Sequence, residues 1–326
     1  MADYQDIRGL RVKYLSADPS TTTAGEVWYN STSGTLKAAV LGTDAWSSGG
    51  ALPVATNALA AAGTTNSSIL AWGGTTPPGA TVTTSLLYNG TSWTATPSLP
   101  AARVYQSGSG TATAALSGSG GDPPTTASDK YDGSSWTSAG TMATGRRHVD
   151  GSGPQSAAFV AGGWTGTALS DATEEYNGAS WSNGGTLNTA RYGISAGGSE
   201  PAGLAMGGGT PDSPPAFSSN EEYNGSSWTN VTSMPGGRAY GIGYGPQTAA
   251  KQVNGDNGSG GVTTVFDYDG TTFSAAPSTA NARIDGAGAG TDNTVGVVTG
   301  GQIPGITATT EEFNEAAAEA QTLTTS

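Results

Sequence analysis

The sequence lacks most of the residues on which metal binding and nucleophilic catalysis depend. It has no cysteine and a single histidine, His148. These absences exclude a disulfide framework, a thiolate metal site and a copper-radical centre with a Cys–Tyr crosslink. Charge is scarce as well: 11% of residues are charged, and 12 Lys and Arg against 25 Asp and Glu give a formal net charge of −13. Because such a chain can neutralise few phosphates, we expect no nucleic-acid partner.

Long apolar runs are also missing. No stretch approaches the roughly 20 apolar residues of a membrane-spanning helix, and MADYQDIRGL at the N-terminus has no apolar segment of a signal peptide. We therefore expect neither membrane insertion nor a Sec-type signal. The chain is instead rich in glycine, with 52 residues, and in Ala, Thr and Ser. This composition is typical of an all-β fold built from short strands and tight turns.

One eight-residue pattern recurs along the chain. It reads EEYNGSSW at 221–228, and its variants are LLYNGTSW at 86–93, DKYDGSSW at 129–136, EEYNGASW at 174–181, FDYDGTTF at 266–273 and a truncated EEFNEAAA at 311–318. Asn and Asp tolerate positive φ, and Gly takes it without steric cost, so the chain can reverse tightly between two aromatic strand ends. Each complete copy therefore predicts a β-hairpin.

Four markers share a period of about 45 residues. The first aromatic residues are Tyr88, Tyr131, Tyr176, Tyr223, Tyr268 and Phe313, and the second are Trp46, Trp93, Trp136, Trp181, Trp228 and Phe273. Ten residues after the second aromatic stand Arg103, Arg146, Arg191, Arg238 and Arg283, with Thr56 in the slot after Trp46. Glycine pairs lie about midway, at 73–74, 120–121, 162–163, 207–209, 260–261 and 300–301. This period, with four short strands per unit, indicates propeller blades.

The combination of Gly-Gly, Tyr, Trp and a following Arg resembles the kelch-like repeats of marine tailed-phage virion proteins. This chain departs from them at Thr56, at Phe273 in place of Trp, and in a last unit without Trp. The resemblance implies blades whose strands a to d run from the axis outward. The repeats start at a d-type strand around Trp46 and end at a c-type strand around Phe313. We therefore predict a six-bladed kelch-like β-propeller over 42–314, closed by the N-terminal d-type strand; the alternative is seven blades with Tyr29 as a further anchor.

Residues 1–41 lie outside the repeat. Segments 26–30 and 35–40 are predicted strands around a Ser33-Gly34 turn, which indicates a small β module with a docking role; the alternative is a disordered leader. The run ADPSTTTAGEVWYNSTSGTLK resembles a short module near the N-termini of tailed-phage fibre and virion structural proteins. That resemblance implies docking to other virion proteins through 1–41, and a homo-oligomer. Residues 315–326 are expected to form a short C-terminal tail, with no conformation assigned to it.

The recurring arginines have two interpretations. They lie between strands d and a, on the same face as the variable b–c loops, where a ring of guanidinium groups could bind carboxylates or sulfated sugars. Alternatively they form ion pairs within each blade, with the acidic residue before the anchor aromatic: Glu175, Glu222, Asp267 or Glu312. The recurrence of acid and arginine in step favours ion pairs. Trp72 and Trp164 stack on sugars or pack internally. The candidate ligand-binding residues are Trp72, Arg103, Arg147, Trp164, Arg191, Arg238 and Arg283.

Nothing in the sequence stands out as catalytic or metal-binding. His148 has no counterpart in the other repeats and is interpreted as a polar residue near the axis. DGSSW at 132–136 has the wrong spacing for the Asp box of sialidase-type propellers, and NGDNGSGG at 254–261 lacks the ligand spacing of a calcium loop. We therefore expect no catalytic residue, no metal and no cofactor.

Three hypotheses of function follow, in order of preference. The first is a phage virion structural protein, a tail fibre or surface-exposed appendage, whose propeller binds host surface glycans. The second is a purely architectural capsid or tail decoration protein that packs against other virion proteins. The third is an enzyme acting on polysaccharide, which the lack of a distinct acid–base pair disfavours. The first two place the chain on the phage particle.

Overall fold

A computed structural model of the chain describes residues 12–210, 216–302, 304–316 and 318–323. The described residues form strands, turns and bends without a helix. There is therefore no helix among them that could cross a membrane. Residues 1–11 of the predicted docking module, 211–215 of one b–c loop and 303 of another lie outside the described residues. The chain divides into two compact units. The larger spans Trp46–Phe313, and the smaller joins the N-terminal residues up to Ala45 to the C-terminal residues from Asn314.

The larger unit is built from four-stranded sheets. In the described residues there are six, numbered here in chain order with strands from inner to outer: β5 (Ala60–Thr65), β6 (Ser68–Trp72), β9 (Ser85–Tyr88), β10 (Trp93–Thr96); β11 (Ser107–Thr111), β12 (Ala114–Gly118), β13 (Ala127–Tyr131), β14 (Trp136–Thr141); β15 (Asp150–Ser152), β16 (Ala158–Ala161), β17 (Thr173–Tyr176), β18 (Trp181–Asn183); β19 (Ser195–Ser199), β20 (Ala202–Met206), β21 (Asn220–Tyr223), β22 (Trp228–Val231); β23 (Ile242–Tyr244), β24 (Ala250–Val253), β25 (Val265–Tyr268), β26 (Phe273–Ala276); β27 (Ala287–Asp292), β28 (Val295–Thr299), β29 (Thr310–Asn314), β4 (Ala45–Gly49). The first five are antiparallel throughout. Strands β7 (Thr75–Thr76) and β8 (Ala80–Thr81) form a separate two-stranded sheet in a loop.

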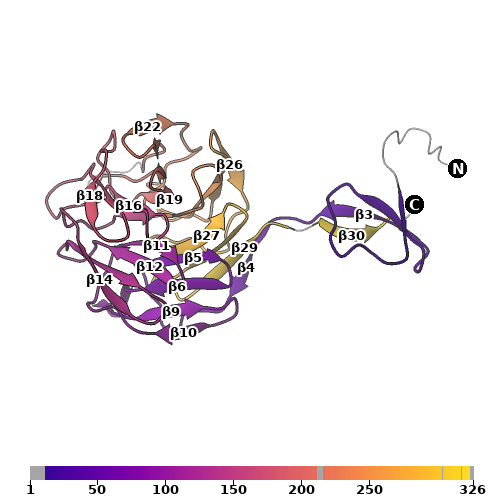
Figure 1. The fold of residues 1–326 in the computed structure, drawn as a ribbon, viewed down its shortest axis with the longest axis horizontal. Helices are drawn as coiled ribbons and strands as arrows, with labels where there is room; N and C mark the ends of the chain where they lie inside the picture. The colour runs from indigo at the N-terminus through magenta and orange to yellow at the C-terminus, as the bar shows by residue number, and fades with distance from the viewer. Residues whose placement is uncertain (1–11, 211–215, 303, 317, 324–326) are drawn as a thin grey trace. The chain divides into compact units, whose positions relative to one another are not determined.

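The sheets follow one another around a common centre. The first strand of each sheet contacts the first strand of the next, and β27 of the sixth sheet contacts β5 of the first. Figure 1 shows β5, β11, β19 and β27 near the middle, with β10, β14, β18, β22 and β26 toward the outside. Strand β4, which precedes the repeats in the chain, lies beside β29 at the outer edge of the sixth sheet, indigo next to yellow. This is the arrangement of a β-propeller-like fold.

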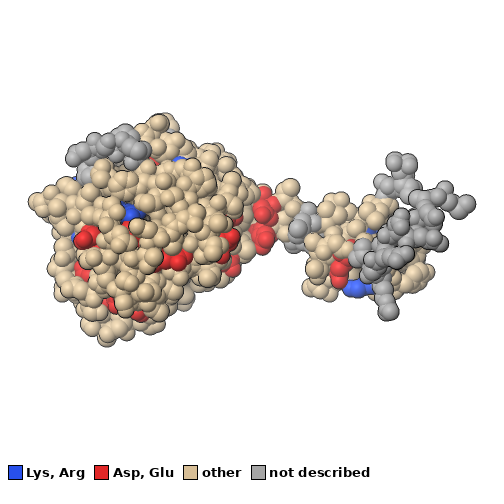
Figure 2. Space-filling view, turned by 90° about the horizontal axis from the view of Figure 1, so that it is seen from above, with Lys and Arg blue, Asp and Glu red and all other residues tan. Residues whose placement is uncertain are grey.

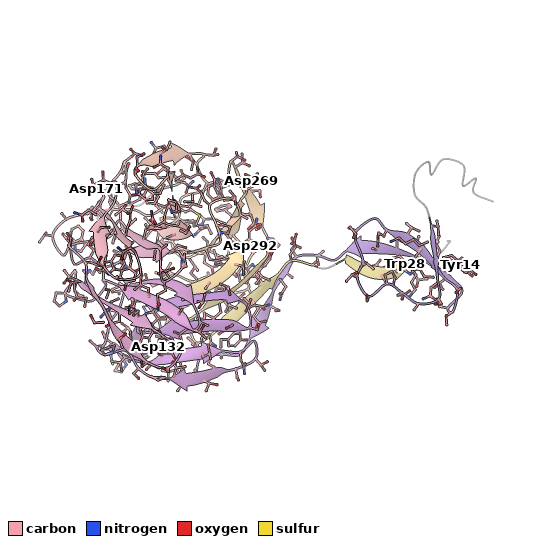
Figure 3. The ribbon with its side chains drawn as sticks, viewed as in Figure 1. Tyr14, Trp28, Asp132, Asp171, Asp269 and Asp292 are labelled. Atoms are coloured by element: carbon pink, nitrogen blue, oxygen red, sulfur yellow. The ribbon has the colours of Figure 1, made fainter. Side chains whose placement is uncertain are left out.

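The predicted hairpins are confirmed. Tyr88 pairs with Trp93 across the turn, and the same register joins Tyr131 to Trp136 and the later pairs. At the turn, the Asn89 side-chain oxygen accepts the N–H groups of Thr91 and Ser92 at 3.0 and 2.9 Å. The residues that do the same in the other hairpins are Asp132, Asn177, Asn224 and Asp269, of which Figure 3 labels the two aspartates. The repeat is thus built on Asx turns.

The glycine pairs join neighbouring sheets. In every unit two successive residues have positive φ, and the second donates its N–H to the carbonyl of the arginine slot of the next unit, at 2.7–3.0 Å. The pairs are 73–74, 119–120, 162–163, 207–208, 254–255 and 300–301. In two units these positions differ from the Gly-Gly pair of the sequence: they are Ser119-Gly120 and Asn254-Gly255, and not 120–121 and 260–261. Asn tolerates this conformation, and the Ser119 hydroxyl donates to the same Arg146 carbonyl at 2.7 Å.

The core lies between adjacent sheets. One buried cluster joins Phe159 of the third sheet to Tyr223 and Trp228 of the fourth. The outer tryptophans also reach the preceding sheet by hydrogen bonds: Nε1 of Trp228 donates to Thr173 Oγ1 at 2.8 Å, and Trp181 makes the equivalent bond to Ser128. The aromatic anchors are conspicuous in sequence because they stabilise the contact between sheets.

The smaller unit is a four-stranded sheet. Its order is β1 (Lys13–Leu15), β2 (Val27–Asn30), β3 (Thr35–Leu41), β30 (Ala318–Thr322). Strands β2 and β3 match the predicted pair, and Tyr29 therefore belongs to this unit and not to a seventh blade. Part of the expected C-terminal tail is a strand of this unit, because 318–322 pair with the free edge of β3. Trp28, labelled in Figure 3, is buried.

Asp18 holds the smaller unit together beside Trp28. Its carboxylate accepts hydrogen bonds from Lys37 Nζ at 2.5 Å, Asn30 Nδ2 at 2.7 Å and Trp28 Nε1 at 3.0 Å. These bonds lower the pKa of Asp18 to about 2. The Asp-Pro of the N-terminal motif thus acts as a structural centre of the sheet.

Candidate functional site

The recurring arginines lie in the interior. Arg146, Arg191 and Arg283 are fully buried, and Arg103 and Arg238 nearly so. In each of the first three, Nη1 donates to two backbone carbonyls and Nη2 to a glutamate. For Arg146 these partners are Gly162 at 2.8 Å, Ala172 at 2.6 Å and Glu174 at 3.0 Å. Both terminal nitrogens of these guanidinium groups therefore have internal partners, although Nε of Arg146 and of Arg283 has none among the described residues.

The predicted acidic partners were wrong by one residue. The arginines pair with Asp129, Glu174, Glu221 and Glu311, and not with Glu175, Glu222, Asp267 and Glu312. Successive residues of a strand face opposite sides, so only one of two adjacent glutamates can reach the arginine. The other faces the next sheet, where it accepts a hydrogen bond from the anchor tyrosine: Glu222 from Tyr268 at 2.7 Å, and likewise Glu175 from Tyr223 and Glu312 from Tyr88.

Two units lack this ion pair, and in both of them the acid position holds an apolar residue. Arg238 lies 4.9 Å from the ring centroid of Phe266, which stands at the acid position. Thr56 replaces arginine in the first unit, where the acid position holds Leu86. Arginine and acid form an internal pair in the other four units. Figure 2 agrees, since little Lys or Arg surface is visible on this face of the larger unit.

Of the candidate ligand-binding residues, only Arg147 and Trp164 remain at the surface. Trp72 is buried and packs on Trp136, with ring centroids 5.1 Å apart. Arg147 and Trp164 are partly exposed and exchange two backbone hydrogen bonds, at 2.9 and 2.8 Å. The chain continues from Arg147 to His148, which lies at the centre of the larger unit.

A closed ring of six backbone hydrogen bonds surrounds that centre. It is formed by the residues two positions after the arginine slot, here called the axial ring: Ala58, Tyr105, His148, Gly193, Tyr240 and Asp285. Each N–H donates to the carbonyl of its counterpart in the preceding unit at 2.7–3.1 Å, and Ala58 closes the ring by donating to Asp285 at 2.7 Å. The ring fixes the position of every side chain that it carries.

The axial ring holds side chains in a conformation that favours glycine. Its five non-glycine residues have φ between 49° and 58°. For residues such as Tyr and His this left-handed conformation is uncommon and costs on the order of 1 kcal/mol or more. A glycine would avoid this cost, yet only one of the six positions, Gly193, holds a glycine. Strained residues gathered at one place are a signal of function.

The side chains of the axial ring meet in one cluster. His148 stacks on Tyr105 with centroids 3.8 Å apart, and its edges face Tyr240 and Tyr192 at 5.2 and 5.5 Å. His148 Nδ1 lies 3.8 Å from Asp285 Oδ1. Tyr105, His148, Tyr240 and Asp285 line a cavity of about 90 Å³. We call this cluster with its cavity the axial mouth.

Burial sets the charges of the axial mouth. It lowers the pKa of His148 to about 3, with a further decrease from Arg147, so the imidazole is neutral at pH 7. Burial also raises the pKa of Asp285 to about 7. The Asp285 side chain is 14% exposed, and its carboxylate accepts no hydrogen bond from any residue that the structure describes. A partly buried carboxylate without a donor among these residues leaves an acceptor for a ligand.

Further charged groups surround the mouth. Arg147 forms an ion pair with Asp122 at 2.5 Å. Asp256 exchanges backbone hydrogen bonds with Ala239, next to Tyr240, and its carboxylate accepts the N–H groups of Gly258 and Gly260 at 2.7 and 3.1 Å. The calcium-like composition around Asp256 thus corresponds to a self-capped loop.

Sequence reasoning missed most of this cluster. It considered His148 alone and set it aside, and it did not single out Tyr105, Tyr192, Tyr240 or Asp285. The available signal was the position two residues after the arginine slot, where the sequence reads Ala, Tyr, His, Gly, Tyr and Asp, close to markers that recur with little change.

Comparison with known proteins leaves the site to be interpreted from its own chemistry. No family model matches the chain, and a search of the curated proteins finds no match. Among the described residues, no three His, Asp or Glu side chains gather as a metal site would require. The axial mouth offers aromatic faces and hydrogen-bond acceptors, which suit a polar molecule with a carbon skeleton.

Proposed function

We propose that this chain is a virion structural protein of a tailed phage, a tail fibre or surface appendage that binds a host surface glycan at the axial mouth. In this proposal the larger unit is a six-bladed kelch-like β-propeller closed by β4. The observation that carries the binding role is the axial mouth itself, because strained aromatic and acidic residues converge there around a cavity. The assignment to a phage rests on the sequence resemblance.

Two sets of hydrogen bonds support a closed six-bladed propeller. The axial ring runs through all six units and returns from Asp285 to Ala58. The bond from the glycine pair to the next arginine slot also returns, from Gly301 to the Thr56 carbonyl. Together with the position of β4 beside β29, they leave no unit without a neighbour.

Saccharide chemistry fits the mouth better than other small ligands do. Tyrosine faces stack on the apolar faces of sugar rings, and carboxylates accept hydrogen bonds from hydroxyl or amino groups. Tyr105, Tyr192 and Tyr240 supply the first, and Asp285 supplies the second. The partly exposed Trp164 lies beside Arg147 at the rim and could extend the surface.

The smaller unit supports attachment to other virion proteins. Of the five large hydrophobic side chains that are exposed in the described residues, four belong to it: Val12, Tyr14, Val40 and Leu323. Exposed apolar side chains concentrated on a small sheet are typical of a docking surface. Strand β30 makes the C-terminal residues part of that module, so the docking role extends beyond 1–41.

Glycan binding can be tested with the purified full chain on an array of bacterial surface polysaccharides, followed by calorimetry of each hit. We expect Tyr240→Gly to weaken binding at least tenfold, because glycine keeps the backbone of the axial ring and removes the aromatic face. Ala58→Gly is the matched control, with the same backbone change and no aromatic loss.

Absence of any glycan binding would overturn the proposal in favour of a purely architectural protein. Equal weakening by both glycine variants would assign the effect to the backbone change and not to the aromatic face, and no weakening by Tyr240→Gly would place the binding site elsewhere. Turnover of a bound polysaccharide would instead favour an enzyme.

A further inference from the structure

We infer that the axial mouth selects a saccharide bearing a free amino group, which it holds as an ammonium ion. This inference rests on the proposed function and names the ligand class of the same site. It follows from the size of the cavity, from the charges around it and from the aromatic faces that line it.

The cavity has room for a substituent of a sugar. The centre of a water-sized group can occupy about 90 Å³ of it, where on the order of 10–15 Å³ is enough to hold one water molecule. An amino group is about the size of a water molecule and can therefore enter the cavity from a sugar held at the rim. Specificity then depends on the chemistry of that substituent.

The charges favour a cation over an anion. Four carboxylates, of Asp285, Asp150, Asp256 and Asp122, stand near the mouth against the single guanidinium of Arg147, for a sum of −3 when all are ionised. The guanidinium already pairs with Asp122, and the His148 imidazole is neutral. The recurring arginines, for which binding of carboxylated or sulfated sugars was one of two interpretations, are buried. An anionic sugar would therefore find no free positive charge here.

The lining suits an ammonium group. Tyr105, Tyr192 and Tyr240 surround the site, and a cation near the face of a tyrosine ring is attracted by its quadrupole. The Asp285 carboxylate has no donor of its own, whereas an ammonium group brings three N–H donors. Acceptor and aromatic faces together match an amino group better than a hydroxyl or an acetamido group, both of which are uncharged.

Three matched tetrasaccharides test this inference. β-1,4-linked tetramers of glucosamine, glucose and N-acetylglucosamine share one backbone and differ at carbon 2, which carries an amino, a hydroxyl or an acetamido group. Calorimetry with the full chain at pH 7 and moderate salt should show the amino form binding at least tenfold more tightly than the other two. Asp285→Asn should reduce its affinity to that of the hydroxyl form.

Asp132→Asn is the matched control, because it removes the same charge at a hairpin turn where three other units already have Asn. It should leave all three affinities unchanged. If it weakens the amino form as much as Asp285→Asn does, the attraction is a general effect of the net charge of −13 and the inference is wrong. Equal affinity for the three tetramers, or binding of other glycans alone, overturns the inference and leaves glycan binding intact. Failure of every glycan overturns the proposed function.

Discussion

The Tyr268 hydroxyl donates a hydrogen bond to Glu222 of the preceding sheet at 2.7 Å. The same bond joins Tyr223 to Glu175 and Tyr88 to Glu312. The sixth unit cannot donate this hydrogen bond, because its anchor is Phe313, which has no hydroxyl. There the acid of the preceding sheet, Asp267, pairs with Lys251 at 2.5 Å, and the Lys251 ammonium lies 3.9 Å from the Phe313 ring centroid. This exception in the repeat thus has its own compensation between sheets.

We predict that Tyr268→Phe lowers the free energy of unfolding by about 1–2 kcal/mol, since it leaves the Glu222 carboxylate without its donor. Chemical denaturation of the full chain measures the change. Tyr176→Phe is the control, because the Tyr176 hydroxyl donates only to the Gly178 carbonyl within its own turn, and the residue before the anchor in the preceding sheet is Lys130. A loss as large in the control as in Tyr268→Phe would contradict a role for the bond between sheets.

Replacement of the buried Lys251 should be more harmful. Its side chain is fully buried, while Asp267 is 26% exposed, so Lys251→Met leaves a partly buried carboxylate without its cation. We expect a loss of about 2–4 kcal/mol in the free energy of unfolding, measured by urea denaturation. Adding Asp267→Asn should recover much of it, because the remaining side chains are then uncharged. No recovery in the double variant would show that packing of the lysine stem, and not its charge, is what matters.

Local patterns predicted the repeat well because a turn depends on a few adjacent residues. Asn-Gly and Asp-Gly between aromatic residues predicted the hairpins, and the period of about 45 residues predicted the succession of sheets. The acidic partner of each arginine could not be chosen, since Glu-Glu before the anchor places one carboxylate on each side of the strand. Strand β30 was missed because its partner β3 comes from the other end of the chain. The axial mouth was missed because six residues far apart in sequence meet only when the ring forms.

The internal arginines give a contrast between a buried ion pair and a cation on an aromatic ring. Arg191→Leu leaves Glu221 fully buried without its guanidinium, and we expect it to cost about 3–5 kcal/mol in the free energy of unfolding. Arg238→Leu removes a contact with Phe266 and leaves no unpaired acid, so about 1–2 kcal/mol is expected. Urea denaturation of both variants measures the difference.

The first unit suggests a second substitution that should restore stability, since it carries Thr56 at the arginine position and Leu86 at the acid position. Combining Arg191→Thr with Glu221→Leu should be less destabilising than Arg191→Thr alone. If the double variant is worse than the single one, the glutamate contributes through its bonds to Asn188 and not mainly through the arginine.

The stability of the larger unit should depend on pH through Asp285. Burial raises its pKa to about 7 from about 3.9 in an unfolded chain, so the folded protein holds this proton more tightly. The stabilising contribution is fully present below pH 4 and is lost as the pH rises through 7. Asp285→Asn removes this dependence and keeps a residue that tolerates the left-handed conformation.

The variant and the unaltered chain should therefore be closest in stability near pH 4. The difference should grow in favour of the variant up to pH 8, by on the order of a few kcal/mol. His148 has a lowered pKa of about 3 and acts in the opposite direction, losing stability as the pH falls below about 6.5. The buried Asp150, with a pKa raised to about 7, acts in the same direction as Asp285. His148 and Asp150 are present in the unaltered chain and in the variant, so the difference between the two urea titrations isolates Asp285. A difference that stays constant from pH 4 to 8 would mean that this carboxylate is solvated and ionises normally.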